Sequence, residues 1–339
     1  MCRQSGCDEG ATVAAAASST SAAAAPPPHG GQSPARALDD PGASPLSVES
    51  SQDAGRYYVA ARRVESGERL LEAGLEAAVV DESYLTRVCA WCMGESKKGA
   101  LRICCGECQN VSYCSDDCQV AAAEAHGMEC VALGRLRKLR TRLDREQSTQ
   151  LRLALQVLYR RRYLQLRGEG AEDATEILCS GRDAFVEQKE WRAREKRYKA
   201  IVCAFAGACG YEFHWTPDEV ETIIGAIECN AFGIWDHNRS RCLGLSLSVN
   251  ASLFNHSCAP NVARVRVGRQ KMFYALSPVE QGEPLCISYI DPRKTLAERR
   301  DDLVHCYGFR CSCSRCTASG HVPQARGVLH RGRLRKEVV

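Results

Sequence analysis

The spacing of hydrophobic residues predicts two main helical stretches. Leu151, Leu155 and Leu158 recur at positions i, i+4 and i+7, which places them on one face of a helix within residues 134–167. A further helix is predicted over 218–229, because the Thr-Pro pair that precedes it is a typical helix start. The middle of the chain is therefore expected to be helical.

Shorter hydrophobic runs with alternating polar residues predict strands. Residues 56–80 contain short β-like runs with a Ser-Gly turn between them. From residue 243 onward the pattern is β: residues 262–267 alternate apolar and polar positions, and strands are predicted again at 272–276 and 285–290. Glycines mark the turns between these runs.

The two ends of the chain differ in composition from its middle. Residues 1–50 are rich in Ala, Ser, Pro and Gly with few large apolar side chains, so we predict that they are disordered. Residues 317–339 form a basic tail. Residues 131–170 hold eleven Lys and Arg against three Asp and Glu. We interpret this run as a solvated basic helix face, with an anionic partner such as nucleic acid as the alternative.

Bulk composition narrows the class of protein. The chain has 339 residues, a net charge of +4 and 21 cysteines, and the small net charge argues against a dedicated nucleic-acid binder. No stretch approaches the roughly 20 apolar residues of a membrane span, and the first residues lack the apolar core of a secretory signal. Disulfide scaffolds are usually short and secreted. Reduced cysteines in the cytoplasm or nucleus are therefore expected, many of them as zinc ligands.

A dense block of cysteines spans residues 89–130. Zinc prefers four thiolate or imidazole ligands in a tetrahedron, and a pair separated by two residues can come from a single turn. Eight ligands in four close pairs predict two closed, structural zinc sites, whose binding free energy stabilises the fold. The eight ligands are Cys89, Cys92, Cys105, Cys108, Cys114, Cys118, His126 and Cys130.

A second group of motifs lies toward the C-terminus. Hydrogen-bonding side chains fill residues 255–261, where a strand would be apolar, and such groups can hold an adenine edge and a charged amino-acid moiety. The segments 282–291 and 306–309 follow in order. Three cysteines then lack a fourth ligand nearby, and the cysteine of the polar motif is the natural one, which predicts a third zinc. Its ligands are Cys258, Cys311, Cys313 and Cys316.

These motifs resemble two known modules. The cysteine block is similar to the MYND zinc finger, including Tyr113 before Cys114 and Gln119 after Cys118. The later segments read NHSCAPN, GEPLCISYID and CYGFRC, and they resemble the SET domain. Together they are similar to the protein-lysine methyltransferases that combine SET and MYND domains, over residues 52–316. The resemblance implies an α+β SET β-clip fold with a pseudo-knot, an inserted MYND finger, a helical insertion and a zinc-bound post-SET loop.

The resemblance also implies domain limits and the partition of the metal ligands. Ligand pairs interleave in the MYND family, so one zinc would be held by Cys89, Cys92, Cys114 and Cys118, and the other by Cys105, Cys108, His126 and Cys130. The implied domains are 1–50 (disordered), 51–88 (N-terminal part of SET), 89–130 (MYND), 131–228 (helical insertion), 229–305 (SET core), 306–316 (post-SET loop) and 317–339 (basic tail).

The implied activity is methyl transfer from S-adenosylmethionine to the ε-amino group of lysine in proteins. The positions that match cofactor contacts in the family are Asn255, His256, Phe309, Gly55 and Arg56. The positions that match the two tyrosines of the methyl-transfer channel are Tyr289 and Tyr307, and those that match the lysine channel are Phe232 and Asn230. A monomer is expected, with a protein substrate, protein partners through the MYND finger, and neither membrane nor nucleic acid.

Some features depart from the family pattern. The cofactor loop is Gly-rich in the family, but here only Gly55 remains of its glycines, and Ala123 stands where a peptide-gripping Trp is usual. Only 23 residues follow Cys316, so a short form without the helical C-terminal domain and with a more open cleft is expected. The alternative function is a catalytically weak MYND-SET scaffold that binds protein partners.

Overall fold

The N-terminal part of the chain enters the fold earlier than predicted. The structure, a computed structural model, describes residues 44–51, 54–139, 143–167, 178–180, 191–210 and 214–318. Strand β1 (Leu46–Ser51) pairs antiparallel with β2 (Gly55–Ala60), with Leu46 opposite Ala60. The prediction of disorder up to residue 50 is therefore wrong for this strand. The predictions for residues 1–43 and for the tail beyond 318 lie outside the described residues.

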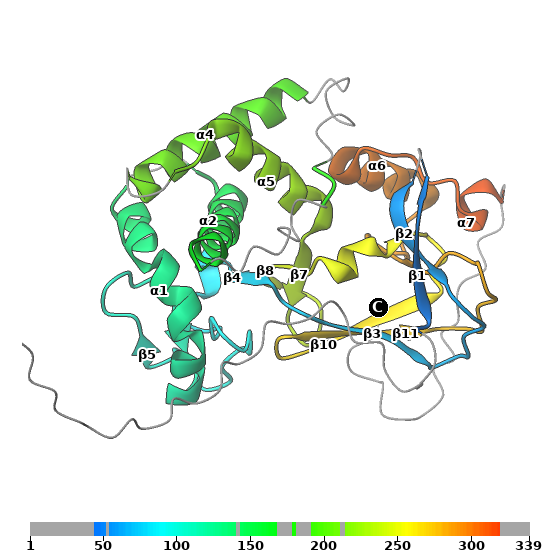
Figure 1. Cartoon of the computed structure of the whole chain (residues 1–339), viewed down its shortest axis with the longest axis horizontal. Helices are drawn as coiled ribbons and strands as arrows, with labels where there is room; N and C mark the ends of the chain where they lie inside the picture. The colour runs from blue at the N-terminus through cyan, green and yellow to red at the C-terminus, as the bar shows by residue number, and fades with distance from the viewer. Residues whose placement is uncertain are drawn as a thin grey trace, which may run out of the picture. The chain divides into compact units, whose positions relative to one another are not determined.

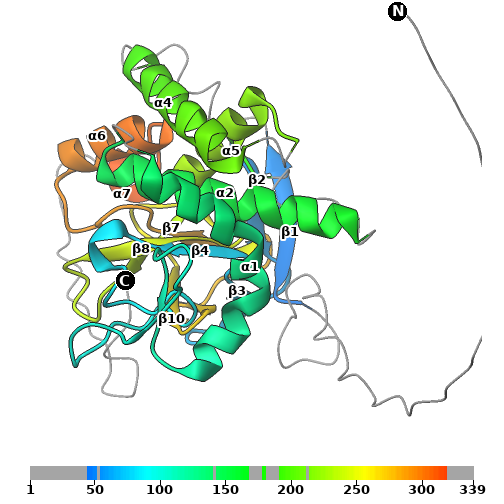
Figure 2. The ribbon, with the colours of Figure 1, turned by 90° about the vertical axis from the view of Figure 1, so that its left-hand side faces the viewer.

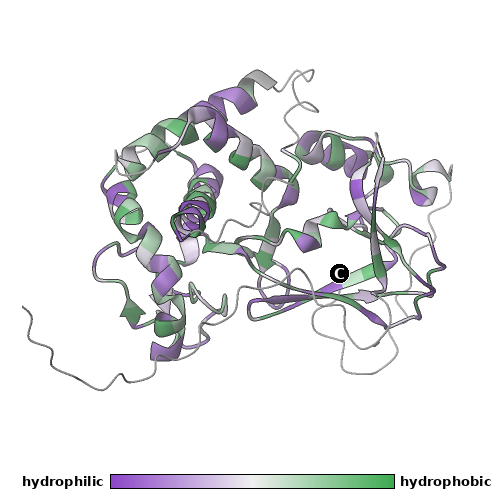
Figure 3. Cartoon of the chain, viewed as in Figure 1, coloured by the Kyte–Doolittle hydropathy of each residue, from purple (hydrophilic) through white to green (hydrophobic). Residues whose placement is uncertain are grey.

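Helices pack together in the middle of the chain. They are α1 (Asp116–Lys138), α2 (Arg145–Leu166), α4 (Trp191–Cys209) and α5 (Pro217–Asn230). Figure 1 shows these four helices grouped together, and Figure 2 shows α2 between α1 and α5, in front of β4 and β8. Hydrophobic and hydrophilic residues alternate along α4 and α5 in Figure 3, as expected of helices with one buried face.

The predicted helices form, with different limits. Leu151, Leu155 and Leu158 are at most 2% exposed on α2, which confirms the predicted buried face. The helix start predicted at the Thr-Pro pair is also confirmed, because Thr216 caps α5 in a capping box with Glu219. The stretch 134–167 was predicted as one helical region, but it holds the end of α1 and all of α2. Helix α1 is continuous across the predicted boundary between the cysteine block and the insertion.

Part of the basic run lies inside the protein rather than in solvent. Arg152 is 3% exposed and donates hydrogen bonds to the carbonyl oxygens of Val80 and Asn110. Arg160 donates to the carbonyl oxygen of Glu76. These arginines connect α2 to the neighbouring backbone, so this part of the run has a structural role that the charge pattern did not indicate.

Short antiparallel sheets make up the rest of the fold. One sheet has the order β10–β11–β3 and a second the order β4–β8–β7. Their strands are β3 (Arg69–Gly74), β4 (Ala77–Val80), β7 (Phe232–Trp235), β8 (Cys242–Leu247), β10 (Val262–Val267) and β11 (Gln270–Ala275). In the first sheet, Phe273 lies opposite both Leu71 and Arg264. The remaining short elements are η1 (Glu82–Tyr84), β5 (Ile103–Cys104), β6 (Ser112–Tyr113) and η2 (Asn250–Leu253).

The C-terminal part brings distant segments together. Strand β9 (Asn255–His256) pairs in parallel with β12 (Cys286–Ile287), so the strand predicted over 285–290 is confined to two residues. The chain then forms α6 (Leu296–Tyr307), which the all-β interpretation of this region missed, and the short α7 (Ser314–Thr317). Thr295 and Glu298 form a capping box at the start of α6, a signal that was present in the sequence.

Two hydrophobic clusters dominate the interior. The larger one joins the helices to the cysteine block, and its most deeply buried members include Leu133, Leu153, Phe205 and Ile224. The other surrounds Phe254 and lies between β3, β11 and η2. No helix among the described residues is both long enough and apolar enough to cross a membrane.

Candidate active site and metal centres

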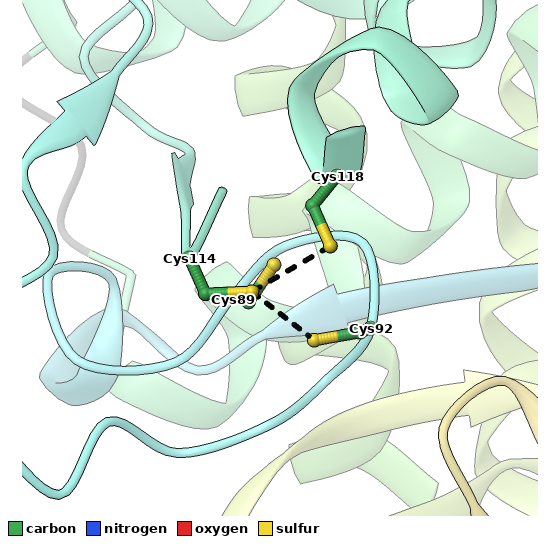
Figure 4. Close-up of side chains that lie close together, drawn as sticks. All are labelled: Cys89, Cys92, Cys114 and Cys118. Carbon is green, nitrogen blue, oxygen red and sulfur yellow. Dashed lines mark hydrogen bonds between the residues drawn. The ribbon is translucent and has the colours of Figure 1, made fainter. Parts of the chain in front are cut away.

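Eight residues of the cysteine block form two clusters of four donors. The first cluster contains Cys89, Cys92, Cys114 and Cys118, drawn in Figure 4, and the second contains Cys105, Cys108, His126 and Cys130. The partition is the interleaved one that the resemblance implied. All donor atoms within a cluster lie within 4.8 Å of one another.

The donor spacing suits a tetrahedral metal ion. The Sγ atoms of Cys92 and Cys114 are 3.7 Å apart, and those of Cys105 and Cys130 are 3.6 Å apart. Four thiolates at zinc-bond length would be separated by about 3.8 Å along each tetrahedral edge. In the second cluster Nε2 of His126 lies 3.7 Å from Sγ of Cys108. Both clusters therefore have the composition and the dimensions of closed structural sites.

Local backbone geometry explains how these donors are presented. Met93 and Gln109, each directly after a Cys-x2-Cys pair, adopt a positive φ, which closes a tight loop around the two thiols. Ser115 caps α1 by accepting a hydrogen bond from the backbone N–H of Cys118, so this ligand lies in the first turn of the helix. His126 and Cys130 follow on the same helix, four positions apart and thus on one face.

A third cluster joins residues from opposite ends of the SET region. Cys258, Cys311, Cys313 and Cys316 come together, as predicted, and the Sγ atoms of Cys258 and Cys316 are 3.5 Å apart although 58 residues separate them in the chain. Nη1 of Arg315 donates to the carbonyl oxygen of Cys258 at 3.0 Å. This cluster attaches the C-terminal segment to the polar motif.

One thiol in each cluster is shifted toward the thiolate form that binds metals. The side-chain hydrogen bond with Cys92 is the largest effect on Cys89, and it helps lower the pKa of that thiol to about 4. Burial opposes ionisation of Cys105 and Cys313, but backbone and side-chain hydrogen bonds outweigh it and lower the pKa of each to about 6.

The parallel pair β9 and β12 positions the polar motif. The backbone N–H of Tyr289 donates to Nδ1 of His256 at 3.0 Å, and Nε2 of His256 lies 3.3 Å from Sγ of Cys258. Burial first, and then the charge of Arg299, lower the pKa of His256 to about 4. The imidazole is therefore neutral at physiological pH and connects the tyrosine segment to the third cluster.

Three aromatic rings gather beside this histidine. The ring centroids of His256 and Tyr289 are 5.3 Å apart, those of Tyr289 and Tyr307 are 5.0 Å apart, and those of His256 and Phe309 are 5.9 Å apart. The hydroxyl of Tyr289 donates to the carbonyl oxygen of Phe254 at 3.0 Å, and that of Tyr307 to the carbonyl oxygen of Tyr289 at 3.4 Å. Segments distant in sequence thus meet in one aromatic group.

Burial keeps both tyrosines in the phenol form. It raises the pKa of Tyr307 to about 12 and the pKa of Tyr289 well above its usual range. Both hydroxyl groups therefore keep their protons at neutral pH. Each donates its proton to a backbone carbonyl, which leaves the lone pairs of the oxygen available to a bound group.

The turn between β1 and β2 lies against the polar motif. Nδ2 of Asn255 donates to the carbonyl oxygen of Ala54 at 2.9 Å, so the turn that contains Gly55 is fixed beside β9. Gly55 has φ +63°, and a Cβ atom built there would meet nothing within 4 Å, so the backbone borders open space. Arg56 is exposed on β2 in the same turn.

The two residues predicted for the lysine channel occupy different environments. Phe232 packs against the same hydrophobic cluster as Tyr289. Nδ2 of Asn230 donates to the carbonyl oxygens of Ala226 and Cys179, so this amide helps to close the end of α5. The channel role of Asn230 stays a prediction.

Two basic residues at Phe232 were not predicted as site residues. Cζ of Arg264 lies 5.3 Å from the centroid of the Phe232 ring, and Nζ of Lys271 lies 3.9 Å from it. Burial first, and then the charge of Arg264, lower the pKa of Lys271 well below its usual range. Alternating positions in a hairpin gave no signal that both side chains would contact one aromatic ring.

The fold and these clusters define an α+β protein in which a polar and aromatic group lies against a C-terminal loop that contributes three thiols to a cluster of four. The model of the SET domain family matches residues 55–290, more than half of the chain. The chain belongs to the SET domain family, and the predicted SET resemblance and fold class are thereby confirmed.

Curated relatives extend the similarity across the cysteine block. A SET and MYND domain-containing protein of Dictyostelium discoideum is 27% identical over 81% of this chain and 82% of its own. The histone-lysine N-methyltransferase Smyd1 of Mus musculus is 26% identical over 80% of this chain and 55% of its own, so this chain spans about half of the mouse protein. The resemblance to SET and MYND domain proteins is therefore confirmed.

A solved structure gives a more distant match. The structure of Rubisco LSMT bound to AdoMet is 14% identical, with a TM-score of 0.41, and the match covers 81% of this chain and 54% of that chain.

Proposed function

We propose that this protein transfers a methyl group from S-adenosylmethionine to the ε-amino group of a lysine in a protein substrate. The observation that carries the proposal is the aromatic group around His256, in which Tyr289, Tyr307 and Phe309 meet beside the polar motif of the SET family. The relatives of the chain support the same reaction class, because one of them is named a histone-lysine N-methyltransferase.

The residues near the Gly55 turn fit the cofactor. The open space beside Gly55 permits close approach of a ligand to the backbone, and Asn255 lies directly next to it. Phe309 is 36% exposed, so its ring is accessible for stacking on a planar base. We assign Asn255, His256, Phe309, Gly55 and Arg56 to this site.

The tyrosines are suited to orient an amine. When bound, S-adenosylmethionine would supply a sulfonium methyl group, and the lysine nitrogen would form the new C–N bond while the C–S bond breaks and sulfur keeps the electron pair. The oxygens of Tyr289 and Tyr307 have lone pairs that can accept hydrogen bonds from the amine and weak C–H···O contacts from a polarised methyl group. Rigid placement of the reacting groups supplies much of such an acceleration.

The substrate lysine must be neutral to attack. A free lysine has a pKa of about 10.4, so its ammonium form must lose a proton to solvent first. The buried surroundings of Tyr289 disfavour a charged group in the same place, since burial penalises ionised forms. The residues of this chain would thereby increase the fraction of reactive amine.

The three metal clusters are assigned to structural zinc ions. Their ligands are eleven cysteines and His126, and each cluster has four donors, so no coordination position remains open for a substrate. Zinc would connect β9 to the C-terminal segment in the third cluster and would hold together the loops of the cysteine block in the other two. None of the three is given a chemical role in methyl transfer.

Calorimetric titration with S-adenosylmethionine tests the cofactor site. The parent protein is expected to bind the cofactor, and Phe309→Ala is expected to reduce the affinity at least tenfold through lost stacking. Tyr163→Ala is the matched control, because this ring lies on α2, outside the proposed site, and bonds to Glu124. Absence of binding by the parent protein, together with absence of methyl transfer to a broad set of proteins, would overturn the proposal.

A further inference from the structure

A single aromatic ring of the proposed lysine channel carries two basic side chains. Arg264 on β10 and Lys271 on β11 project from the same face of the hairpin, because Arg264 pairs with Phe273 and Lys271 pairs with Arg266. Both reach Phe232 on β7, with the guanidinium carbon of Arg264 5.3 Å from its ring centroid. Such pairs are stabilised by the negative face of the ring.

Of these two side chains, only Arg264 remains charged at physiological pH. Lys271 is 4% exposed and donates to Oγ of Ser246 at 3.1 Å, and burial favours its neutral form. The pKa of Arg264 is lowered by burial first and then by Arg239, but only to about 10, so the guanidinium is charged at physiological pH. Within the described part of the chain, no carboxylate lies at ion-pair distance from Arg264.

This cation lies within electrostatic range of the tyrosine pair. The charge of Arg264 acts on Tyr289 and Tyr307, and their rings are 5.0 Å apart. The other titratable groups that face Arg264, Lys271 or these tyrosines are Arg239, Arg266, Glu76, Cys229, Cys286, Cys306 and Asp302. Two of them are carboxylates: Asp302 pairs with Lys294 at 2.6 Å, and Glu76 faces Lys271, with its own pKa raised by burial. Within the described residues neither carboxylate pairs with Arg264, so the charge of its guanidinium remains beside Phe232.

We propose that Arg264 is a specificity-determining residue of the amine channel. This inference rests on the proposed function. Its fixed cation admits the target lysine as a neutral amine and repels the ammonium form. A neutral amine can donate to the tyrosine oxygens without this repulsion, whereas an ammonium group would place two like charges near one ring. Two unit charges about 10 Å apart in a partly solvated site change a pKa by about one unit. Neither tyrosine needs to ionise.

The test uses ligands that place an amine in the channel without any reaction. The first ligand is an S-adenosylmethionine analogue in which nitrogen replaces sulfur and carries a four-carbon arm that ends in an amine. The second ends in a hydroxyl group instead. Calorimetric titrations between pH 7 and pH 10 compare the parent protein with Arg264→Gln, Arg264→Lys and Arg266→Gln. Arg266 is the matched control, since it lies on the same strand and bonds to the carbonyl oxygen of Gly268.

The expected result is a gain, not a loss, of affinity for the amine ligand when Arg264 is replaced by glutamine. At pH 7.5 the Arg264→Gln variant binds the amine ligand about tenfold more tightly than the parent, because the ammonium form is no longer repelled. Its affinity for the hydroxyl ligand is unchanged. Arg264→Lys and Arg266→Gln behave as the parent does. In methyl-transfer assays, the acidic limb of the pH–rate profile shifts upward by about one unit in Arg264→Gln alone.

The other possible outcomes distinguish failure of the role of Arg264 from failure of the proposed function. Equal ratios of amine to hydroxyl affinity in the parent and in Arg264→Gln at every pH would overturn the role of Arg264. An equal loss of affinity for both ligands would make Arg264 a structural wall residue and would also overturn it. Failure of the parent to bind S-adenosylmethionine itself would overturn the proposed function, and this inference with it.

Discussion

The cysteine block and the C-terminal cysteine cluster use the same ligand chemistry in different ways. In the cysteine block the thiols of Cys105 and Cys130 meet across 25 residues, and all eight ligands lie within one short segment. In the third cluster the thiols of Cys258 and Cys316 meet across 58 residues. The first arrangement holds together its own loops, whereas the second attaches one part of the proposed active site to another.

The neighbours of the two regions differ accordingly. Cys258 lies two residues from His256, and Nε2 of that histidine is 3.3 Å from its Sγ atom. Tyr289 and Tyr307 pack against the third cluster. The ligands Cys89 and Cys108 of the cysteine block instead belong to the core of the helical insertion. Loss of a metal from the cysteine block should therefore affect local stability, whereas loss of the metal from the third cluster should affect cofactor binding.

Removal of all metal should have the largest effect. Three zinc ions per chain are expected by elemental analysis, and structural zinc contributes about 10–16 kcal/mol in small zinc-dependent folds. A chelator should expose residues 89–130 to rapid proteolysis, because few other cross-links hold these loops. The control is the same digestion after zinc is added back. A zinc content of one or none, or digestion that chelation leaves unchanged, would contradict the assignment.

Substitution of a single metal ligand should distinguish the roles of the two regions. Cys258→Ser is expected to lower the zinc content from three to two and to reduce the affinity for S-adenosylmethionine about 100-fold, because His256 loses its neighbour. Cys118→Ser should also lose one zinc but leave this affinity within about twofold. Zinc analysis and calorimetry on both variants provide the comparison. Similar losses of affinity in the two would show that the regions are coupled.

Removal of one hydroxyl group from the aromatic group should affect rate more than stability. Tyr289→Phe is expected to lower the rate constant by about 10²–10³, by analogy with oxyanion-hole donors, while cofactor affinity is retained. The carbonyl of Phe254 loses its donor, so unfolding should become easier by about 1 kcal/mol. Tritiated methyl transfer to a protein lysate measures the rate, with Tyr163→Phe as control. Full activity of Tyr289→Phe would remove this residue from the catalytic set.

Helix caps provide the smallest and most closely matched comparison. Ser115 caps α1 in the cysteine block, and Thr295 caps α6, which ends at Tyr307. Ser115→Ala and Thr295→Ala should each lower the free energy of unfolding by about 1 kcal/mol in denaturant titrations. Only Thr295→Ala should also lower methyl transfer, by a few-fold, because α6 places Tyr307. Equal activities of the two variants would show that α6 tolerates loss of its cap.

Local patterns in the sequence were sufficient for much of this protein. The apolar face of Leu151, Leu155 and Leu158 and the Thr-Pro start of α5 predicted buried helices, because helical periodicity and capping involve residues a few positions apart. Close ligand pairs predicted metal sites for the same reason, and Cys258 was predicted as the fourth ligand because the three C-terminal cysteines had none nearby. Helix α6 was also readable from its capping box but was overlooked within a β-rich interpretation.

Contacts between distant segments were decided by the tertiary structure. Nothing in the alternation of residues 262–267 indicates that Arg264 reaches the ring of Phe232 on another sheet, or that Lys271 reaches the same ring. The sequence also did not indicate that the amide of Asn230 bonds to the carbonyl oxygens of Ala226 and Cys179 at the end of α5. Periodicity specifies which face of an element is buried. The partner that buries it depends on how separate elements pack, and this packing placed an unpredicted cation beside the proposed lysine channel.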